Sequence, residues 1–161
     1  MNKNMHCSEC NGKIEEDNFF FVDGQPVCYY CLFGEIEPIP IYPIGQVIEK
    51  TTEEISRIDL FPYQQKFMYR LNEEERITVI YYLHEINSVK SVFKRGKNSN
   101  GKEVGVFASH TPHRTSRIAV SEVSLDYISG VSIYVRGLDA FVNSPVLDIK
   151  SGRTGRKKPT G

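Results

Sequence analysis

Residues 118–138, IAVSEVSLDYISGVSIYVRGL, contain the pattern that decides the fold. Two runs rich in β-branched and aromatic residues, at 118–127 and 131–138, predict two β-strands. Ser129-Gly130 separates them and is short enough for a tight hairpin turn. The pattern therefore predicts an antiparallel strand pair inside a β-rich domain.

More strands are expected on both sides of this hairpin. Short β-branched or alternating runs place them at 44–49, 55–61, 103–109 and 146–149. The run ITVIYYL at 77–83 is nearly continuously apolar, which is typical of a strand buried on both faces. Pro62 opens PYQQKFMYRL, which suits a short helix with proline in its first turn. Many strands, short turns and one short helix predict a mainly β fold, a small antiparallel β-barrel.

All four cysteines lie near the start of the chain, in the pattern Cys7-x2-Cys10-x17-Cys28-x2-Cys31. Two residues between cysteines let both thiolates face one ion, and two such pairs complete a tetrahedral shell. Four soft thiolates suit zinc, and a filled shell makes the zinc structural; an iron–sulfur centre or redox dithiols are the alternatives. A segment of about 30 residues is too small to fold around its own core, so metal binding would supply its folding energy. The segment resembles small zinc-ribbon or treble-clef modules.

The proline content predicts the domain boundaries. Pro38, Pro40 and Pro43 cannot continue a helix or a central strand, so residues 37–43 are expected to form an extended linker. The cysteine module would then cover residues 1–36 and the barrel residues 44–150. The last eleven residues, 151–161, have four bases and no acid, and we expect a disordered basic tail.

The net charge is zero but unevenly spread. Residues 1–40 hold seven acids and two bases, whereas residues 41–161 hold thirteen acids and eighteen bases. This asymmetry is compatible with an anionic partner for the second part, and equally with ordinary variation between solvated surfaces. No run of about 18 apolar residues exists, so no membrane span is expected. The opening MNKNMHCSEC lacks the apolar centre of a signal peptide, which predicts a cytoplasmic protein with reduced thiols.

Four blocks of sequence carry a family resemblance. They are Pro43-Ile44-Gly45, YYLHE at 81–85, GVFASHTPHRTSRIAVSEVSL from Gly105, and GLDAFVNSPVLDIK from Gly137. In order and spacing, from about Pro43 to Lys150, the chain resembles the TsaA-like (TrmO) family. The resemblance implies a small antiparallel β-barrel that forms a homodimer and binds S-adenosylmethionine. It also implies N-methylation of the threonylcarbamoyl-modified adenosine beside the anticodon of tRNA.

The resemblance also implies the positions of the cofactor site. The residues at matching positions are Leu83, His84, Ser109, His110, Ile118, Ala119, Leu138, Asp139, Ala140 and Phe141. An amine or amide nucleophile must lose a proton, and His84 or Asp139 is the natural acceptor, so these two are the catalytic candidates. Asp139 could instead accept hydrogen bonds from the cofactor. The plainer alternatives are a hydrogen-bonded histidine at a strand end and a turn aspartate after Gly137.

Basic residues between the strands are the candidates for RNA contacts. The set is Lys94, Arg95, Lys97, Arg114 and Arg117. If they line one mouth of the barrel, they would bind a phosphate backbone with strong salt dependence, and Phe93 could stack on an unpaired base. The alternative is a mobile lysine-rich loop over 94–102 that is polar for solubility.

The chain departs from the family pattern at several positions. The family motif P-N-P-I-G is TSRIA at 115–119, the family arginine after F-A-T is His110, and the P-R-Q segment after P-I-G is missing. Ala119 adds a β-carbon where the family has glycine. These departures favour a rival function, a non-catalytic RNA- or nucleotide-binding barrel that has lost methyl transfer. A second rival is a methyltransferase that acts on a small molecule or a protein.

Overall fold

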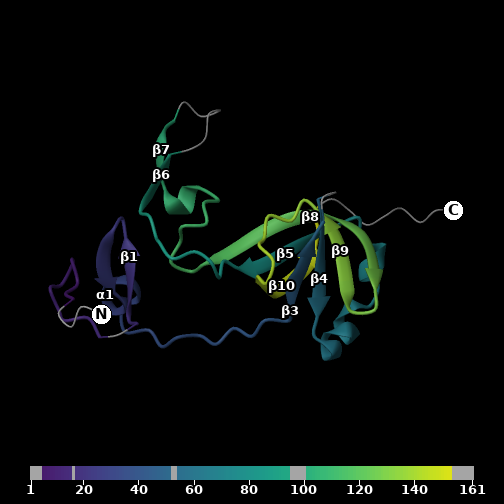
Figure 1. The fold of residues 1–161 in the computed structure, drawn as a ribbon, viewed down its shortest axis with the longest axis horizontal. Helices are drawn as coiled ribbons and strands as arrows, with labels where there is room; N and C mark the ends of the chain where they lie inside the picture. Colours follow the sequence, from purple (N-terminus) through teal and green to yellow (C-terminus); the bar gives the residue numbers. More distant parts are fainter. Residues whose placement is uncertain (1–4, 16, 52–53, 95–100, 154–161) are drawn as a thin grey trace. The chain divides into compact units, whose positions relative to one another are not determined.

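The computed structural model describes residues 5–15, 17–51, 54–94 and 101–153 (Figure 1). The chain divides into two compact units. Unit 1 contains Met1–Pro40 and Glu85–Arg117, and unit 2 contains Ile41–His84 and Ile118–Gly161. Glu85–Arg117 lies inside the expected barrel domain of residues 44–150 but is grouped with unit 1; the expected domain boundaries stay a prediction. Within the described ranges, no helix is long and apolar enough to cross a membrane.

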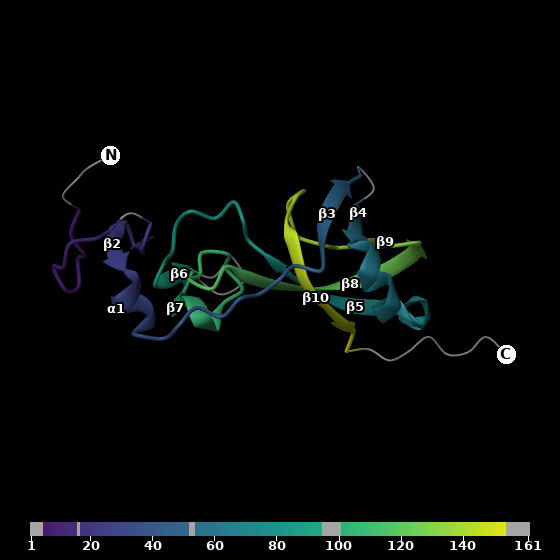
Figure 2. The same ribbon diagram turned by 90° about the horizontal axis from the view of Figure 1, so that it is seen from below.

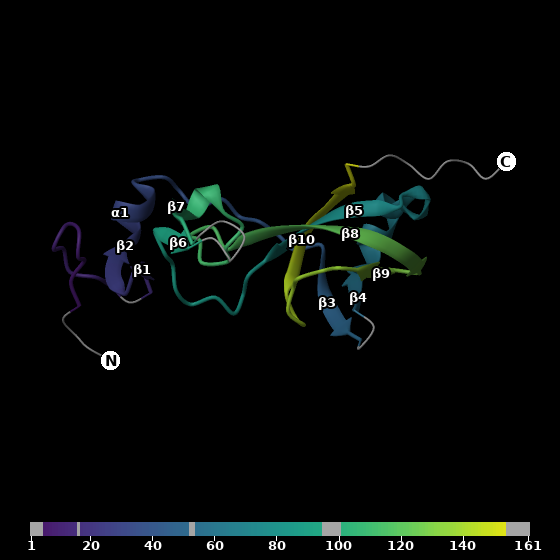
Figure 3. The ribbon, with the colours of Figure 1, turned by 90° about the horizontal axis from the view of Figure 1, so that it is seen from above.

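Unit 2 is a closed antiparallel barrel with the strand order β10-β3-β4-β9-β8-β5. Its strands are β3 (Gly45–Lys50), β4 (Ile55–Leu60), β5 (Arg76–Tyr82), β8 (Ile118–Ser129), β9 (Ser132–Arg136) and β10 (Pro145–Ser151). The long strand β8 runs beside β5 in Figure 3, in an unbroken register from Arg76 opposite Ser124 to Tyr82 opposite Ile118. The hairpin expected around Ser129-Gly130 joins β8 to β9, with Gly130 at a φ of 61°. The predicted barrel and the mainly β class are therefore confirmed.

The barrel interior is aliphatic. Side chains alternate between the two faces of a strand, so one face of each strand fills the interior. The apolar interior residues with at most 1% exposure are Val47, Ile58, Ile77, Val79, Val123, Ile133, Val135 and Val146. Along β5 buried residues alternate with half-buried ones. The expectation that this strand is buried on both faces is wrong, because a barrel has one interior and the outward-facing Ile80 and Tyr82 stay partly exposed.

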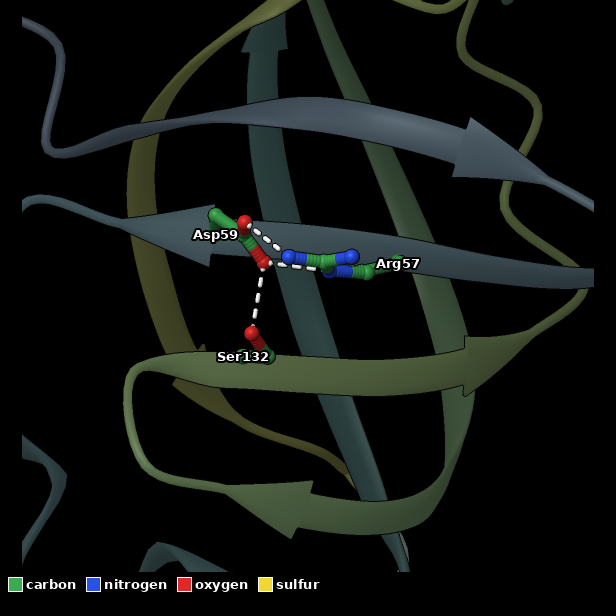
Figure 4. A network of polar contacts seen from close by, with 3 residues as sticks. All are labelled: Arg57, Asp59 and Ser132. Carbon is green, nitrogen blue, oxygen red and sulfur yellow. Dashed lines mark hydrogen bonds and ion pairs between the residues drawn. The ribbon is translucent and has the colours of Figure 1, made fainter.

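A polar network lies on the outward face of β4. Its residues alternate along the strand with the interior residues Ser56 and Ile58. Arg57 donates from Nε and Nη2 to the two carboxylate oxygens of Asp59, at 2.8 and 2.6 Å. Ser132 of β9 donates to Asp59 Oδ1 at 2.7 Å (Figure 4). The hydrogen bonds from Arg57 lower the pKa of Asp59, and those to Asp59 raise the pKa of Arg57. The network thus adds side-chain bonds to the backbone ladder between β4 and β9.

Two short 3₁₀ helices connect β4 to β5. The first, η1 (Pro62–Met68), carries Pro62 in its first turn, and the second is η2 (Leu71–Glu73). The helix expected at 62–71 is therefore shorter and of the 3₁₀ type. Residues 37–43 have neither helix nor strand and are exposed. Of the expected tail at 151–161, Ser151 ends β10, and residues 154–161 lie outside the described residues.

Unit 1 is built from small elements. A hairpin of β1 (Phe19–Val22) and β2 (Gln25–Cys28) is followed directly by α1 (Tyr29–Phe33). Figure 2 shows β2 next to α1, and Figure 3 labels all three elements. A second hairpin pairs β6 (Val92–Lys94) with β7 (Glu103–Gly105) and leads into the 3₁₀ turn η4 (Val106–Ala108). The strand expected at 103–109 thus ends at Gly105, and β6 was not expected from the sequence.

Aromatic rings hold the first hairpin and α1 together. Phe20 stacks on Tyr29 at a centroid distance of 5.4 Å, and both contact Phe33 edge-on, at 6.2 and 5.5 Å. Among the described residues of this unit, the buried apolar ones are Cys7, Val27, Val89 and Val106. Unit 1 therefore has a small core.

Candidate functional site

The four cysteines of unit 1 converge on one point. Their Sγ atoms all lie within 4.8 Å of one another, with 3.8 Å between Cys7 and Cys31 and 3.9 Å between Cys10 and Cys28. Zn–S bonds of about 2.3 Å in a tetrahedron place sulfur atoms about 3.8 Å apart, so the donor set fits zinc. The first pair lies on a tight turn, and the second pair on the N-cap and body of α1. This order of turn, hairpin and helix corresponds to the treble-clef alternative of the sequence prediction.

Backbone N–H groups point at these sulfur atoms. Cys28 N–H donates to Cys7 Sγ at 3.3 Å, and Gly12 N–H donates to Cys10 Sγ at 3.4 Å. The bond from Cys28 lowers the pKa of the Cys7 thiol to about 6. A hydrogen bond with the Cys28 thiol raises the pKa of Cys31 to about 12. The site thus favours a thiolate at Cys7, and a bound cation would favour thiolates at all four positions.

In unit 2, the end of β5 meets the loop that follows β9. Tyr81 donates its hydroxyl to the backbone oxygen of Asp139 at 2.5 Å. Ser144 Oγ lies 3.3 Å from His84 Nδ1. Burial raises the pKa of Tyr81, so its phenol stays protonated and acts as the donor. These two bonds bring the catalytic candidates His84 and Asp139 to one region of the barrel.

The loop from Leu138 to Phe141 alternates between inward and outward side chains. Leu138 and Ala140 are only 4% and 3% exposed. Asp139 is exposed, and Phe141 is 55% exposed. Gly137 starts the loop at a φ of 86°, a conformation that favours glycine. Of the four loop residues among the expected cofactor positions, two therefore anchor the loop and two present a carboxylate and an aromatic ring.

Ile118 and Ala119 lie beside this region. They open β8 and pair with Tyr82 and Tyr81, immediately before Leu83 in the neighbouring strand. Leu83 is 9% exposed, whereas Ile118 and Ala119 are half-buried. The structure therefore brings together around the barrel end the eight expected cofactor positions that belong to unit 2.

Ser109 and His110 belong to unit 1, in the loop after η4. Ser109 Oγ donates to Val106 O at 2.8 Å. Arg114 donates to three backbone oxygens of the same loop, those of Thr111 at 2.9 Å, Val106 at 3.1 Å and Ser109 at 2.5 Å. The loop borders a hollow of about 530 Å³, lined by Phe93, Phe107, Ala108, Ser109, His110, Thr111 and Pro112. The hydrogen bonds from Arg114 thus fix the backbone of the loop that borders this hollow.

The expected RNA-binding residues have varied surroundings. Lys94 lies 3.8 Å from the carboxylate of Glu103, across the β6–β7 pair. Arg117 places its guanidinium over the ring of Phe20, 4.8 Å from the centroid. Arg114 bonds its own loop, and Arg95 and Lys97 lie outside the described residues. The RNA-binding role of this set stays a prediction.

The fold agrees with a comparison to protein families. Residues 31–152 match the model described as the tRNA-methyltransferase O N-terminal domain. The chain belongs to this TrmO family. The resemblance read from the sequence blocks is thereby confirmed.

Several curated proteins are related to this TrmO-family chain. A protein of Methanothermobacter thermautotrophicus, described as a probable S-adenosyl-L-methionine-binding protein, is 37% identical over 100 residues, which cover 62% of this chain and 70% of that protein. The VirR protein of Rhizobium radiobacter, with the same description, is 37% identical over 79 residues, 49% of this chain and 44% of that protein. The tRNA (adenine(37)-N6)-methyltransferase of Homo sapiens is 27% identical over 92 residues, 56% of this chain and 21% of that protein. The chain thus spans less than half the length of the VirR and human relatives.

Solved structures show the same fold. The crystal structure of TrmO from Pseudomonas aeruginosa superposes with a TM-score of 0.56 at 20% identity, over 71% of this chain and 56% of that one. A second crystal structure of that protein gives a TM-score of 0.57 at 21% identity, over 73% of this chain and 55% of that one. At this identity the likeness concerns the fold.

Proposed function

We propose that this chain is an S-adenosylmethionine-dependent tRNA methyltransferase. Its reaction would be N-methylation of the threonylcarbamoyl-modified adenosine beside the anticodon. The observation that carries the proposal is the family match over residues 31–152, together with relatives named tRNA (adenine(37)-N6)-methyltransferase. The barrel supports it because residues far apart in the sequence meet at the end of β5, at the positions where the family resemblance places the cofactor.

Two side chains of the loop after β9 suit the cofactor. The exposed carboxylate of Asp139 can accept hydrogen bonds from ribose hydroxyls or an amino group. The exposed ring of Phe141 offers an apolar face to a planar base. Leu138 and Ala140 hold this loop from the inside, and Tyr81 fixes its backbone at Asp139. When bound, S-adenosylmethionine supplies an electrophilic methyl group, and the protein's share of catalysis is mainly positioning.

His84 is the proposed proton acceptor. A base role requires the tautomer in which Nδ1–H donates to Ser144 Oγ, because Nε2 then keeps its lone pair. Ser144 is 1% exposed and its backbone N–H donates to Phe141 O at 3.1 Å, so the orienting hydroxyl is itself fixed. Asp139 is the second candidate for this role.

Transfer of labelled methyl groups to bulk tRNA tests the proposal. We expect label in tRNA with the unaltered protein, and a loss of about 10²- to 10⁴-fold in rate for His84→Gln if His84 acts as the base. Asp139→Asn should weaken cofactor binding measured by titration calorimetry, and Tyr81→Phe should weaken it less. Asp126→Asn, which removes a carboxylate paired with Arg136 at 3.3 Å, is the matched control.

The calorimetry and the labelling assay together separate the rival functions. No heat of binding at high cofactor concentration would remove the enzyme proposal and favour a non-catalytic RNA- or nucleotide-binding barrel. Clear cofactor binding without label in tRNA would favour a small-molecule or protein substrate.

Replacing Lys94 by Ala should lower the salt slope of RNA binding by about 1 if it contacts a phosphate.

We further propose a structural zinc at Cys7, Cys10, Cys28 and Cys31, a homodimer, and a cytoplasmic location where tRNA is available. The sulfur spacing of 3.8 and 3.9 Å supports zinc. Metal analysis of the purified protein should give one zinc per chain. Sedimentation equilibrium should give twice the chain mass of 18.4 kDa. A measured mass equal to that of one chain would contradict the proposed homodimer but not the proposed zinc site.

A further inference from the structure

The turn of the cysteine hairpin is bonded to the segment Glu85–Arg117, which we call the inserted segment. Asp23 N–H donates to Val89 O, and Val89 N–H donates to Phe21 O, both at 3.0 Å. Val22 and Val89 form a parallel β-bridge, and Val89 is only 5% exposed. The inserted segment is therefore joined to the edge of β1 by a single β-bridge at Val89.

A chain of hydrogen bonds leads from this turn to the loop of Ser109 and His110. The carboxylate of Asp23 accepts one bond from Ser91 N–H at 3.1 Å and a second from Ser91 Oγ. These bonds lower the pKa of Asp23, so the acceptor is a carboxylate near neutral pH. Ser91 O in turn accepts from Val106 N–H at 3.0 Å. Val106 O accepts from Ser109 Oγ at 2.8 Å.

The other end of the inserted segment is held by the same hairpin. Arg117, its last residue, lies over the ring of Phe20. Phe20 stacks on Tyr29, which follows the cysteine Cys28 directly. Two separate contacts, one at Val89–Ser91 and one at Arg117, thus run from the stretch between the two cysteine pairs to the inserted segment.

The hairpin cannot supply this support by itself. A two-stranded hairpin is marginal in water, and the buried apolar residues of the described part of unit 1 are few. The cysteine cluster joins the turn at Cys7 and Cys10 to the end of β2 and to α1, so a bound metal would tie the stretch before the hairpin to the end of the hairpin.

We propose that the four-cysteine module is an internal clamp for the inserted segment, with Asp23 and Phe20 as its positioning residues. Metal loading fixes the hairpin, and the hairpin fixes the loop that carries Ser109 and His110. This role rests on the proposed zinc site and gives the module a purpose within the proposed methyltransferase, the support of cofactor residues.

Amide hydrogen exchange of the full chain tests the clamp. In the zinc-loaded protein, peptides covering 85–94 and 103–117 should exchange slowly, and removal of the metal by a chelator should speed their exchange by about tenfold or more. Peptides from β5 and β8 should not change. Asp23→Asn should give the same local increase at 85–94 and 103–117 while zinc content stays at one per chain. Asp17→Asn is the matched control, because both aspartates have a left-handed φ, 69° for Asp17 and 49° for Asp23, which asparagine tolerates.

The affinity for S-adenosylmethionine distinguishes the clamp from a role of Asp23 in the stability of the hairpin alone. Asp23→Asn should raise the Kd for S-adenosylmethionine about 3- to 10-fold, and Asp17→Asn should leave it unchanged. Unchanged exchange in the inserted segment, after chelation and in Asp23→Asn with zinc retained, would overturn the clamp. If the unaltered protein binds no cofactor, the methyltransferase proposal fails, and the exchange experiment alone decides the clamp.

Discussion

The two units of this chain are stabilised in different ways. The barrel has a continuous aliphatic interior, with Ile58, Ile77 and Ile133 at 0% exposure. Unit 1 has a four-cysteine cluster, a group of aromatic rings in which Tyr29 and Phe33 are exposed, and a set of hydrogen bonds around Asp23. The comparison teaches that a hydrophobic core suffices for one unit, whereas the other, with its small core, is expected to depend on the proposed zinc. Each unit should therefore fail under a different change.

The largest effect is expected from loss of a thiolate. Cys28→Ser removes a ligand of the proposed zinc, and structural zinc in such sites contributes about 10 to 16 kcal/mol to folding. We expect unit 1 to lose its fold, seen as loss of the near-ultraviolet circular dichroism of Phe20, Tyr29 and Phe33. The amide signals of the barrel should persist.

A matched variant sharpens this result. His6→Ala changes an exposed residue beside the proposed ligand Cys7 and should leave both zinc content and circular dichroism unchanged. Loss of zinc in His6→Ala would instead make the histidine a ligand. A Cys28→Ser protein with an intact unit 1 would contradict the dependence on metal.

The barrel core should show the opposite pattern. Ile133→Ala leaves a cavity at a residue of 0% exposure and should cost about 2 to 5 kcal/mol of the free energy of unfolding. Zinc content should not change, because the cysteines belong to unit 1. Ile48→Ala, at a 38% exposed position of the same barrel, should cost less than about 0.5 kcal/mol. Denaturant unfolding followed at barrel tyrosines measures both, and equal costs would contradict the assignment of the interior.

Substitutions at two glycines, one in each unit, give a third and smaller contrast. A β-carbon on Gly45 would lie 2.4 Å from Asp59 O and 2.8 Å from Leu60 Cα. Gly45→Ala should therefore force β3 away from β4 and cost about 1 to 3 kcal/mol. At Gly105 in unit 1, with a φ of −60°, a β-carbon would meet no atom within 4 Å. Thermal unfolding of both variants should show that Gly105→Ala is neutral or slightly stabilising. A penalty as large as that of Gly45→Ala would contradict the packing argument.

The strands and the cysteine cluster could be predicted from sequence because their signals are local. Alternating β-branched residues marked β3, β4, β8 and β9, and paired cysteines at short spacing marked the thiolate cluster. The burial of β5 on both faces was mispredicted, since half-buried Ile80 and Tyr82 on the outer face look like core residues in a one-dimensional pattern. The strand β6 was missed because it is three residues long beside a lysine-rich stretch.

The supporting contacts of the site could not be predicted for a physical reason. Tyr81 and Asp139 lie 58 residues apart, His84 and Ser144 lie 60 apart, and Asp23 and Ser91 lie 68 apart. Only the fold brings such partners together, so no spacing rule exposes them. One signal was available for Tyr81, because a tyrosine inside an apolar strand needs a partner for its hydroxyl. The three backbone bonds of Arg114 had no such signal, and charge alone suggested RNA.

The smallest expected effect concerns the ion pair on the outer face of β4 (Figure 4). The bonds from Arg57 hold the pKa of Asp59 below its ordinary value of 3.8, so the carboxylate is more acidic in the folded protein than in the unfolded chain. A depressed folded pKa contributes stability above the unfolded pKa, and that contribution is lost as the pH falls through the folded pKa. Because the two side chains are 35% and 26% exposed, the coupling should be only about 0.2 to 1 kcal/mol.

A double-mutant cycle of Arg57→Ala and Asp59→Asn isolates this coupling. It should be present near neutral pH, decrease below about pH 4, and disappear once Asp59 is protonated in the folded barrel. Urea unfolding at each pH measures it, and zinc content should be the same in all four proteins. A coupling that persists in acid would mean that Arg57 and Asp59 interact through packing rather than charge. Because both residues lie in the barrel, a simultaneous change in unit 1 would show that the two units are not stabilised separately.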